Sequence, residues 1–319
     1  MTVDRSPTRL PLAALAARQG SVFTRKQALA AGLTHARIET LLRRKAWLAV
    51  GYGCYCIAAQ SDPEYAHART CAARLLGSSG DPLVSHDSAG VLLELPYVEV
   101  PARPTLTSAR NGPPEHRNGM FAAAIPTEHR VEVFGFTVTS GPRTLVDLLR
   151  NAPDELVAQS LADGGLRAEI GLVQLQGVLG VCAGWPGIAR ARAALTFAEP
   201  RCESPLESHN RIWFRDGGLP APTPQYLVRN ADGKPIARVD FCFKQQRVVV
   251  ECDGQIKYRK GSSWQAKPEE TLWAEKLRED KVRDQGYEVV RSYAKDGQDA
   301  GAALCRRIHQ AAARAARRF

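Results

Sequence analysis

The sequence lacks any long hydrophobic run and any pattern of paired cysteines. No uninterrupted apolar stretch approaches about 18 residues, and the N-terminus has no signal-like pattern, so we expect a soluble, cytoplasmic protein without a membrane segment. The eight cysteines are scattered and do not have zinc-site spacing. In such a protein they are expected to be reduced, half-buried thiols, which excludes disulfide-rich and zinc-finger classes.

A serine-hydrolase elbow of the form Gly-x-Ser-x-Gly is also missing. The chain does contain Ser85, His86 and Asp87 in succession, and these are the residue types of a hydrolytic triad. Without the strained turn that exposes the nucleophile, a structural polar turn is the favoured interpretation.

Positive charge is abundant and local. The net charge of the 319 residues is +10, and residues 1–60 alone hold nine Lys or Arg against two acids. The length predicts two or three domains. We predict an α/β (α+β) protein with a winged helix-turn-helix in residues 1–60, a small α/β domain in 61–198, and a mixed sheet flanked by helices in 199–319.

The first 60 residues contain the start signals of short helices followed by a hairpin. Thr24 to Gln27 form a capping box, Thr34 caps the next helix, and Trp47 to Ile57 is apolar and punctuated by glycine. Two short helices followed by a β-wing are typical of a winged helix that binds DNA through its second helix. The candidate phosphate-contacting residues are Arg25, Lys26, Arg37, Arg43, Arg44 and Lys45. The alternative is a helical domain whose basic face is solvated or binds another protein.

Two strand-like segments in the C-terminal third contain the candidate catalytic acids. Residues 238–243 and 247–254 are rich in β-branched and aromatic residues, and a four-residue turn between them pairs Asp240 with Glu251. Asp253 has the same parity as Glu251, so we expect three carboxylates on one face.

Carboxylates placed so closely repel each other unless a cation joins them. Mg²⁺ (or Mn²⁺) takes such oxygen ligands together with water and phosphate, so Asp240 and Glu251 are the predicted metal ligands of a phosphodiesterase. The structural alternative places both aspartates in turns and pairs Glu251 with a lysine. The run of three valines before Glu251 favours the site, because it marks an interior strand.

Residues 200–295 resemble the endonuclease-like domains related to very-short-patch repair nucleases, of the PD-(D/E)xK class. The resemblance is carried, in order, by Glu203-Ser-Pro-Leu-Glu207, Gly218-Leu-Pro-Ala-Pro, Gln225, Arg238-Val-Asp-Phe, Val250-Glu-Cys-Asp-Gly254, Lys257-Tyr258, Asp280-x-x-Arg283 and Gly286-Tyr-Glu-Val-Val-Arg291. It implies a restriction-endonuclease-like fold, metal ligation by Asp240 and Glu251, and a third acid at Asp253.

The resemblance departs from the class at one catalytic position. The lysine expected two residues after the ligand is Asp253 here, and Lys257 stands near the place where relatives carry a histidine. Lys257 either orients water and stabilises charge, or contacts a phosphate. Glu207 is explained by a helix cap, yet the resemblance places an acid there close to the metal. Lys276 and Arg283 lie on one helix face, as either an intrahelical ladder or a DNA-facing stripe.

The N-terminal segment resembles AbiEi-type antitoxins, which are DNA-binding repressors of type IV toxin-antitoxin systems. Ser85-His86-x-Ser88-Ala89 and Thr139-Ser-x-Pro-Arg-Thr144 resemble the region that follows the winged helix in those proteins. Two functions are therefore open. One is a metal-dependent DNA endonuclease. The other is a non-enzymatic DNA-binding regulator or antitoxin, with a degenerate nuclease fold and a cognate toxin or another protein as its partner.

Overall fold

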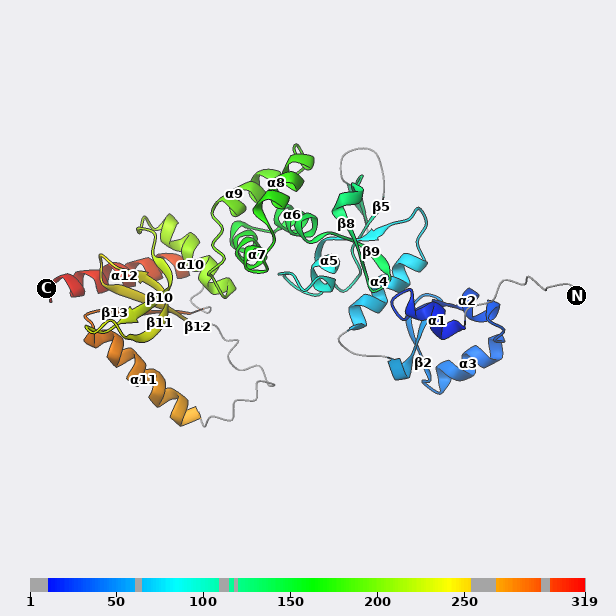
Figure 1. Cartoon of the computed structure of the whole chain (residues 1–319), viewed down its shortest axis with the longest axis horizontal. Coiled ribbons are helices and arrows are strands. Elements are labelled where there is room, and N and C mark those ends of the chain that lie inside the picture. Colours follow the sequence, from blue (N-terminus) through cyan, green and yellow to red (C-terminus); the bar gives the residue numbers. More distant parts are fainter. Residues whose placement is uncertain are drawn as a thin grey trace, which may run out of the picture. The chain divides into compact units, whose positions relative to one another are not determined.

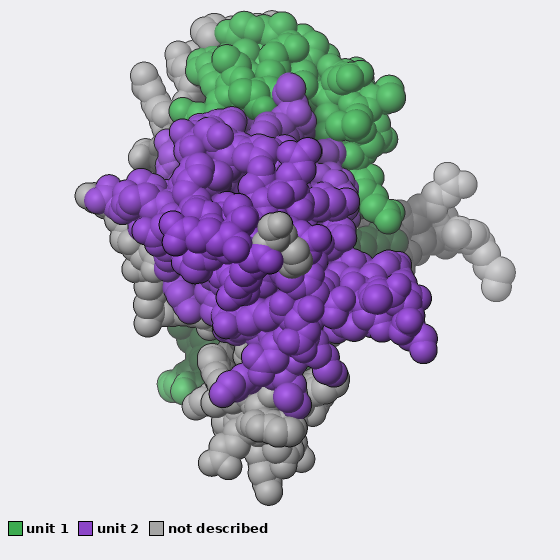
Figure 2. All heavy atoms as spheres, turned by 90° about the vertical axis from the view of Figure 1, so that its left-hand side faces the viewer, with its two compact units in different colours: residues 1–152, 168–193 green, residues 153–167, 194–319 purple. Residues whose placement is uncertain are grey.

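The computed structural model describes residues 11–60, 65–108, 115–117, 120–253, 268–293 and 299–318. The chain divides into two compact units, distinguished by colour in Figure 2. Unit 1 comprises residues 1–152 and 168–193, and unit 2 comprises 153–167 and 194–319. Unit 1 thus holds the predicted domain 1–60 and most of the predicted domain 61–198, whereas 153–167 and 194–198 lie in unit 2.

Unit 1 begins with three short helices and a three-stranded antiparallel sheet. Its elements are α1 (Leu12–Ala17), β1 (Phe23–Thr24), α2 (Arg25–Ala30), α3 (His35–Arg43), β2 (Trp47–Gly51) and β3 (Cys54–Ile57). The capping box at Thr24 is present, with the Gln27 N–H donating to the Thr24 hydroxyl and the Thr24 N–H donating to the Gln27 amide oxygen. Thr34 caps α3 as predicted. The three strands pair in the order β1-β3-β2, and Phe23, Trp47 and Tyr55 form the aromatic core.

The rest of unit 1 is a six-stranded sheet with helices. Its elements are η1 (Ala58–Gln60), α4 (Ala66–Leu76), β4 (Leu83–Val84), α5 (His86–Leu92), β5 (Leu106–Ser108), β6 (Glu115–Arg117), β7 (Met120–Ala122), η3 (Thr127–His129), β8 (Arg130–Val133), β9 (Phe136–Thr139), α6 (Gly141–Asn151), α8 (Leu172–Val181) and α9 (Ile188–Thr196), in which the chain passes to unit 2. The strand order is β6-β7-β5-β4-β9-β8.

The Ser85 and His86 pair is buried at the junction of β4 and α5. The Ser85 hydroxyl lies 2.9 Å from Nδ1 of His86 and accepts a hydrogen bond from the Thr107 hydroxyl at 2.8 Å. Ser85 is fully buried and His86 is almost so. This geometry agrees with a structural polar turn and not with an exposed nucleophile.

Unit 2 is a four-stranded mixed sheet covered by helices. Its elements are α7 (Glu155–Arg167), α10 (Pro205–Asp216), β10 (Thr223–Arg229), β11 (Pro235–Phe243), β12 (Val248–Asp253), α11 (Pro268–Asp284), β13 (Glu288–Tyr293) and α12 (Ala300–Ala316). The order is β10-β11-β12-β13, with β12 and β13 parallel and the other pairs antiparallel. Figure 1 shows α11 and α12 on opposite sides of this sheet.

Alternation along the strands gives the sheet two apolar faces. Phe241, Phe243, Val248 and Val250 pack with residues of α10 and α12 on one face, and Cys242 and Val249 pack with Val282 of α11 on the other. The mixed α/β fold class predicted from the sequence is therefore confirmed. Among the described residues, no helix combines the length and the apolar character that crossing a bilayer requires.

Candidate functional site

The candidate site lies where β11 and β12 part from each other. Their pairing runs from Phe243 opposite Val248 to Phe241 opposite Val250, as a four-residue turn predicts. Beyond that point β11 remains paired with β10, and β12 remains paired with β13 as far as Asp253. Because β11 stays with β10 and β12 stays with β13, these two strands separate and a cleft opens at Asp240 and Glu251. One wall of the cleft is β11 and the other is β12.

This cleft has a volume of about 570 Å³ and a charged lining. It is lined by Glu203, Ser204, Pro205, Glu207, Arg238, Val239, Asp240, Glu251, Cys252, Asp253 and Arg278. All of these residues belong to unit 2. Asp240 and Glu251 thus share one cleft, as the register predicted.

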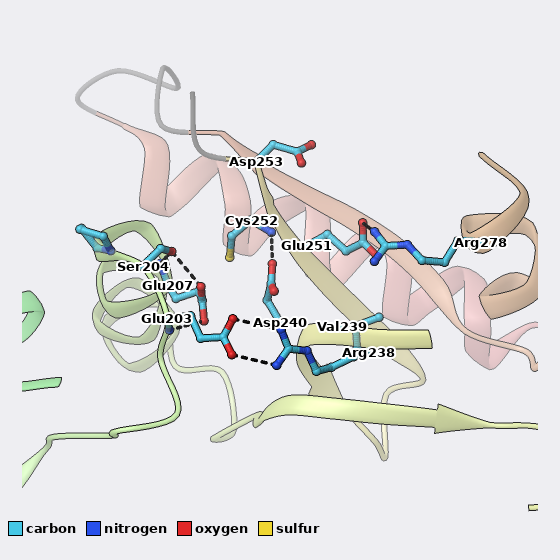
Figure 3. Close-up of a pocket in the computed structure, with 11 residues that line it drawn as sticks. Glu203, Ser204, Glu207, Arg238, Val239, Asp240, Glu251, Cys252, Asp253 and Arg278 are labelled. Atoms are coloured by element: carbon cyan, nitrogen blue, oxygen red, sulfur yellow. Dashed lines mark hydrogen bonds and ion pairs between the residues drawn. The ribbon is translucent and has the colours of Figure 1, made fainter. Parts of the chain in front are cut away.

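Asp240 bridges the parted strands through its side chain. Its Oδ2 accepts a hydrogen bond of 2.6 Å from the backbone N–H of Cys252, where a regular ladder would use a backbone carbonyl (Figure 3). The Asp240 side chain is half-buried. A carboxylate has about four acceptor sites, so this hydrogen bond leaves acceptor capacity for a ligand in the cleft.

Glu251 is the most deeply placed acid on the β12 wall. It is 6% exposed, and its Oε2 lies 3.1 Å from Nη2 of Arg278 on α11. Burial raises the pKa of Glu251 above its usual value, the nearby arginines lower it in part, and the charges of Asp240 and Asp253 raise it further. A cation that enters the cleft would therefore stabilise the charged form of Glu251.

Glu207 enters the cleft from the first turn of α10. Its carboxylate accepts hydrogen bonds from the Ser204 hydroxyl at 2.8 Å, the Glu203 N–H at 3.0 Å and Nε2 of Gln225 at 2.8 Å. Ser204 caps the helix as predicted, but Glu207 reaches the N–H of Glu203 and not that of the cap residue. Burial raises the pKa of Glu207, and the Asp240 charge adds to this rise. Glu207 therefore has both a capping role and a place beside Asp240.

Asp253 forms an ion pair with Arg291. Its Oδ2 lies 3.0 Å from Nη1 of Arg291, whose Nη2 binds Glu279 at 2.8 Å. Figure 3 shows the Asp253 carboxylate pointing away from that of Asp240. Within the part of the chain that the structure describes, no three His, Cys, Asp or Glu side chains form a group that could hold a metal ion. Asp253 thus lines the same cleft as Asp240 and Glu251 but is paired with Arg291, and its role as a third acid of the site stays a prediction.

The basic residues predicted to act in this unit, Lys257, Lys276 and Arg283, are not among the described residues that line the cleft. Lys257 lies outside the described residues. Lys276 and Arg283 are exposed on α11 and do not line the cleft, and Arg283 pairs with Glu279 at 2.6 Å. Among the residues of α11 whose side chains the structure describes, the one that reaches the cleft is Arg278, which was not predicted from the sequence. A signal was present, because Arg278 lies one helical turn before the buried Val282 and therefore shares its sheet-facing side.

Two more residues were missed as functional positions, Arg238, which lines the cleft, and Gln225, which contacts the lining residue Glu207. Gln225 lies opposite Asp240 in the β10 and β11 pair, with a left-handed φ of 48°, and its amide holds Glu207. Arg238 lies at the rim and pairs with Glu203 through two contacts of 2.8 and 3.0 Å. Nothing local in the sequence indicates either contact.

The donor set of the cleft suits a hard divalent cation. Asp240 and Glu251 supply carboxylate oxygens from opposite walls, and Mg²⁺ is typically bound by one or two carboxylates with water completing its shell. The raised pKa of Glu207 and of Glu251 reflects burial and excess negative charge, which a cation relieves. Asp240 and Glu251 are therefore the residues that would hold Mg²⁺ or Mn²⁺, with Glu207 beside them.

The predicted DNA-contacting residues of the first 60 residues lie in and after α2 and α3. Arg37 and Arg43 are exposed on α3, and Arg44 and Lys45 are exposed directly after it, Lys45 having a left-handed φ of 55°. The remaining predicted contacts, Lys26 and Arg25, lie on α2. Lys26 is exposed, whereas Arg25 forms an ion pair with Glu39 of α3 and is partly neutralised.

Comparison with known proteins finds a partial match. The chain is 36% identical over 104 residues to two uncharacterized proteins of Mycobacterium tuberculosis, one from strain CDC 1551 and one from strain H37Rv. The match covers 33% of this chain and 35% of each relative. No family model matches the chain. The relatives carry no described activity, so the nuclease and antitoxin resemblances stay predictions.

Proposed function

We propose that this protein is a DNA-binding, metal-dependent endonuclease that hydrolyses phosphodiester bonds in the cleft of unit 2. The observation that supports it most strongly is the parting of β11 and β12, which leaves Asp240 and Glu251 on the two walls of one cleft. A pure DNA binder has no need of buried acids facing phosphate, because they would repel it.

The roles of the residues follow from their contacts. Asp240 and Glu251 would hold Mg²⁺ or Mn²⁺, which supplies charge neutralisation and a more acidic water. Glu207 is the candidate base, because its raised pKa gives it proton affinity and it lies beside Asp240. As the water oxygen bonds to phosphorus, the ester P–O bond breaks. One proton of the attacking water passes to the base, and the leaving alkoxide takes a proton from solvent water, so the products are a phosphate monoester and a free hydroxyl.

The winged helix of unit 1 would bring DNA to the protein. The exposed charges of Arg37, Arg43, Arg44 and Lys45 cluster in and directly after α3. Exposed positive charge on such a helix binds backbone phosphates and releases counterions. DNA as the substrate implies action in the cytoplasm.

A cleavage assay tests the proposal. The protein is incubated with supercoiled, linear and single-stranded DNA, with and without Mg²⁺ or Mn²⁺, beside Asp240→Asn and Glu251→Gln. We expect cleavage only with metal, a loss of about 10²-fold or more in rate for each variant, and DNA affinity that holds or rises. Absence of cleavage of every DNA form with either metal, with DNA binding intact, would overturn the proposal.

A second candidate function is a non-enzymatic DNA-binding regulator or antitoxin, with a toxin as protein partner. The observation that favours it is that the acids of the cleft already have partners in the protein. Glu251 pairs with Arg278, Asp253 pairs with Arg291, and Asp240 accepts the Cys252 N–H. The same cleavage assay separates the two functions.

A further inference from the structure

An ion pair spans the cleft between α11 and β12. Nη2 of Arg278 lies 3.1 Å from Oε2 of Glu251, and the side chains are 40% and 9% exposed respectively. The arginine therefore extends from the open part of the cleft onto a buried carboxylate, and Figure 3 shows the two groups directed at each other.

The charge balance of the cleft makes this arginine distinctive. Its lining, as far as the structure describes it, contains five carboxylates and two guanidinium groups. One guanidinium, that of Arg238, is bound at the rim by both oxygens of Glu203. Among the described residues that line the cleft, Arg278 is therefore the cation that contacts a candidate metal ligand.

We propose that Arg278 is a charge-exchanging residue that also contacts DNA. In the metal-free cleft it neutralises Glu251, and when a divalent cation takes Glu251 it transfers to a phosphate oxygen of the bound DNA. This inference rests on the proposed function of the cleft and adds a residue that none of the sequence motifs contains.

Two physical arguments support the exchange. A guanidinium and a divalent cation compete for the same carboxylate oxygen, so binding of one weakens binding of the other. Because Arg278 is partly exposed, it can leave Glu251 without stranding a buried charge, which would be costly. Its planar fork of donors then matches the two oxygens of a phosphate better than a lysine ammonium does.

A fixed structural ion pair predicts different behaviour. If Arg278 only attached α11 to the sheet, its removal would lower stability and would leave cation affinity unchanged or weakened. Competition predicts the opposite sign, because removal of the competitor frees Glu251 for the cation. The sign of the change in metal affinity therefore separates the two roles without any measurement of cleavage.

The test uses the full chain and two readouts besides activity. Mn²⁺ affinity is measured by calorimetry, and duplex DNA affinity is measured with and without Ca²⁺, for wild type, Arg278→Ala and Arg278→Lys. Arg215→Ala is the matched control, because Arg215 is 41% exposed, pairs with Glu155 and Asp216, and does not line this cleft.

We expect Arg278→Ala to bind Mn²⁺ about threefold to fivefold more tightly, the range that loss of a competing, partly exposed ion pair allows. The same variant should lose the gain in DNA affinity that Ca²⁺ gives the wild type, and Arg278→Lys should retain part of it. Arg215→Ala should match the wild type in both measurements. Unfolding curves of all variants show whether each is folded. If Arg278→Ala is unfolded, Arg278→Lys replaces it in both measurements.

Unchanged or weaker Mn²⁺ binding by Arg278→Ala would overturn the exchange. A Ca²⁺-dependent gain in DNA affinity that survives in Arg278→Ala would overturn the phosphate contact. If the wild type cuts no DNA while both expected changes occur, the exchange stands and the endonuclease proposal fails. The two failures are thus distinguishable.

Discussion

Replacing Glu251 with Gln removes one negative charge from the cleft with almost no change in shape. Burial raises the pKa of Glu251, so the folded protein favours its neutral form more than the unfolded chain does. The resulting stability is present at low pH and is lost as the pH rises through the folded pKa. Gln has nearly the shape of the neutral acid and does not ionise, so the variant does not lose this stability as the pH rises. The substitution also removes the ion pair with Arg278, which contributes up to about 1 kcal/mol to stability at a partly exposed position.

The metal-free variant should therefore unfold within about 1 kcal/mol of the wild type at neutral pH. A cation at ten times its Kd stabilises the wild type by about 1.4 kcal/mol, since the gain is RT ln(1 + [L]/Kd). This corresponds to a rise of roughly 3–6 °C in the Tm of unit 2. Glu251→Gln should show almost none of this rise in a calorimetric titration with Mn²⁺.

Glu288→Gln is the matched control for this experiment. Glu288 is 12% exposed and pairs with Arg314 and Arg318, but it does not line the cleft. It should keep the full Mn²⁺-induced rise in Tm. An equal rise in Glu251→Gln would refute metal binding by Glu251, and a loss of several kcal/mol without metal would refute the pKa argument.

Three further outcomes are expected. Changing Arg43, Arg44 and Lys45 to Ala should weaken DNA binding and reduce the salt slope by about 0.9 for each phosphate that the protein no longer neutralises, which fluorescence anisotropy at several salt concentrations measures. An unchanged affinity at low salt would show that this face binds something else. Lys257→Ala should lower the cleavage rate about 10²-fold with Mn²⁺ affinity intact if it stabilises the transition state, whereas a mild loss of DNA affinity alone identifies a backbone contact. Asp147→Asn should destabilise unit 1 by about 3 kcal/mol in chemical denaturation, because this fully buried acid accepts hydrogen bonds from two arginines, and a loss below about 1 kcal/mol would contradict that role.

The pH dependence of Asp147 has the opposite sign to that of Glu251. Burial alone would raise the pKa of Asp147, but the positive charges of His86, Arg143 and Arg150 outweigh it and lower the pKa overall. Its contribution to stability is present above the unfolded pKa and is lost as the pH falls through the folded pKa. Asp147→Asn should therefore flatten the acid limb of the stability profile of unit 1.

Local signals in the sequence were sufficient to predict the strand register and the helix caps. The alternation around the four-residue turn places Phe243 opposite Val248, and the parity of Asp240 and Glu251 follows from that pairing. The capping box at Thr24 is equally local, because its donor and acceptor lie three residues apart.

Contacts between distant segments could not be predicted in this way. Arg291 reaches Asp253 because parallel pairing places Glu251 beside Arg291, and this register depends on how β13 docks after α11. Similarly, the Lys276 and Arg283 stripe was chosen without knowing how α11 is rotated on the sheet. The spacing of Arg278 and Val282 places both on one helix face, but the packing of α11 decides that this face is the one turned to the sheet and the cleft.

Anomalous diffraction from Mn²⁺-soaked crystals tests most directly the central claim that the parted strands form a divalent-cation site. We predict a manganese peak between the carboxylates of Asp240 and Glu251, with the guanidinium of Arg278 displaced from Glu251. A cleft without a peak at saturating Mn²⁺, with Arg278 still bonded to Glu251, would contradict the account.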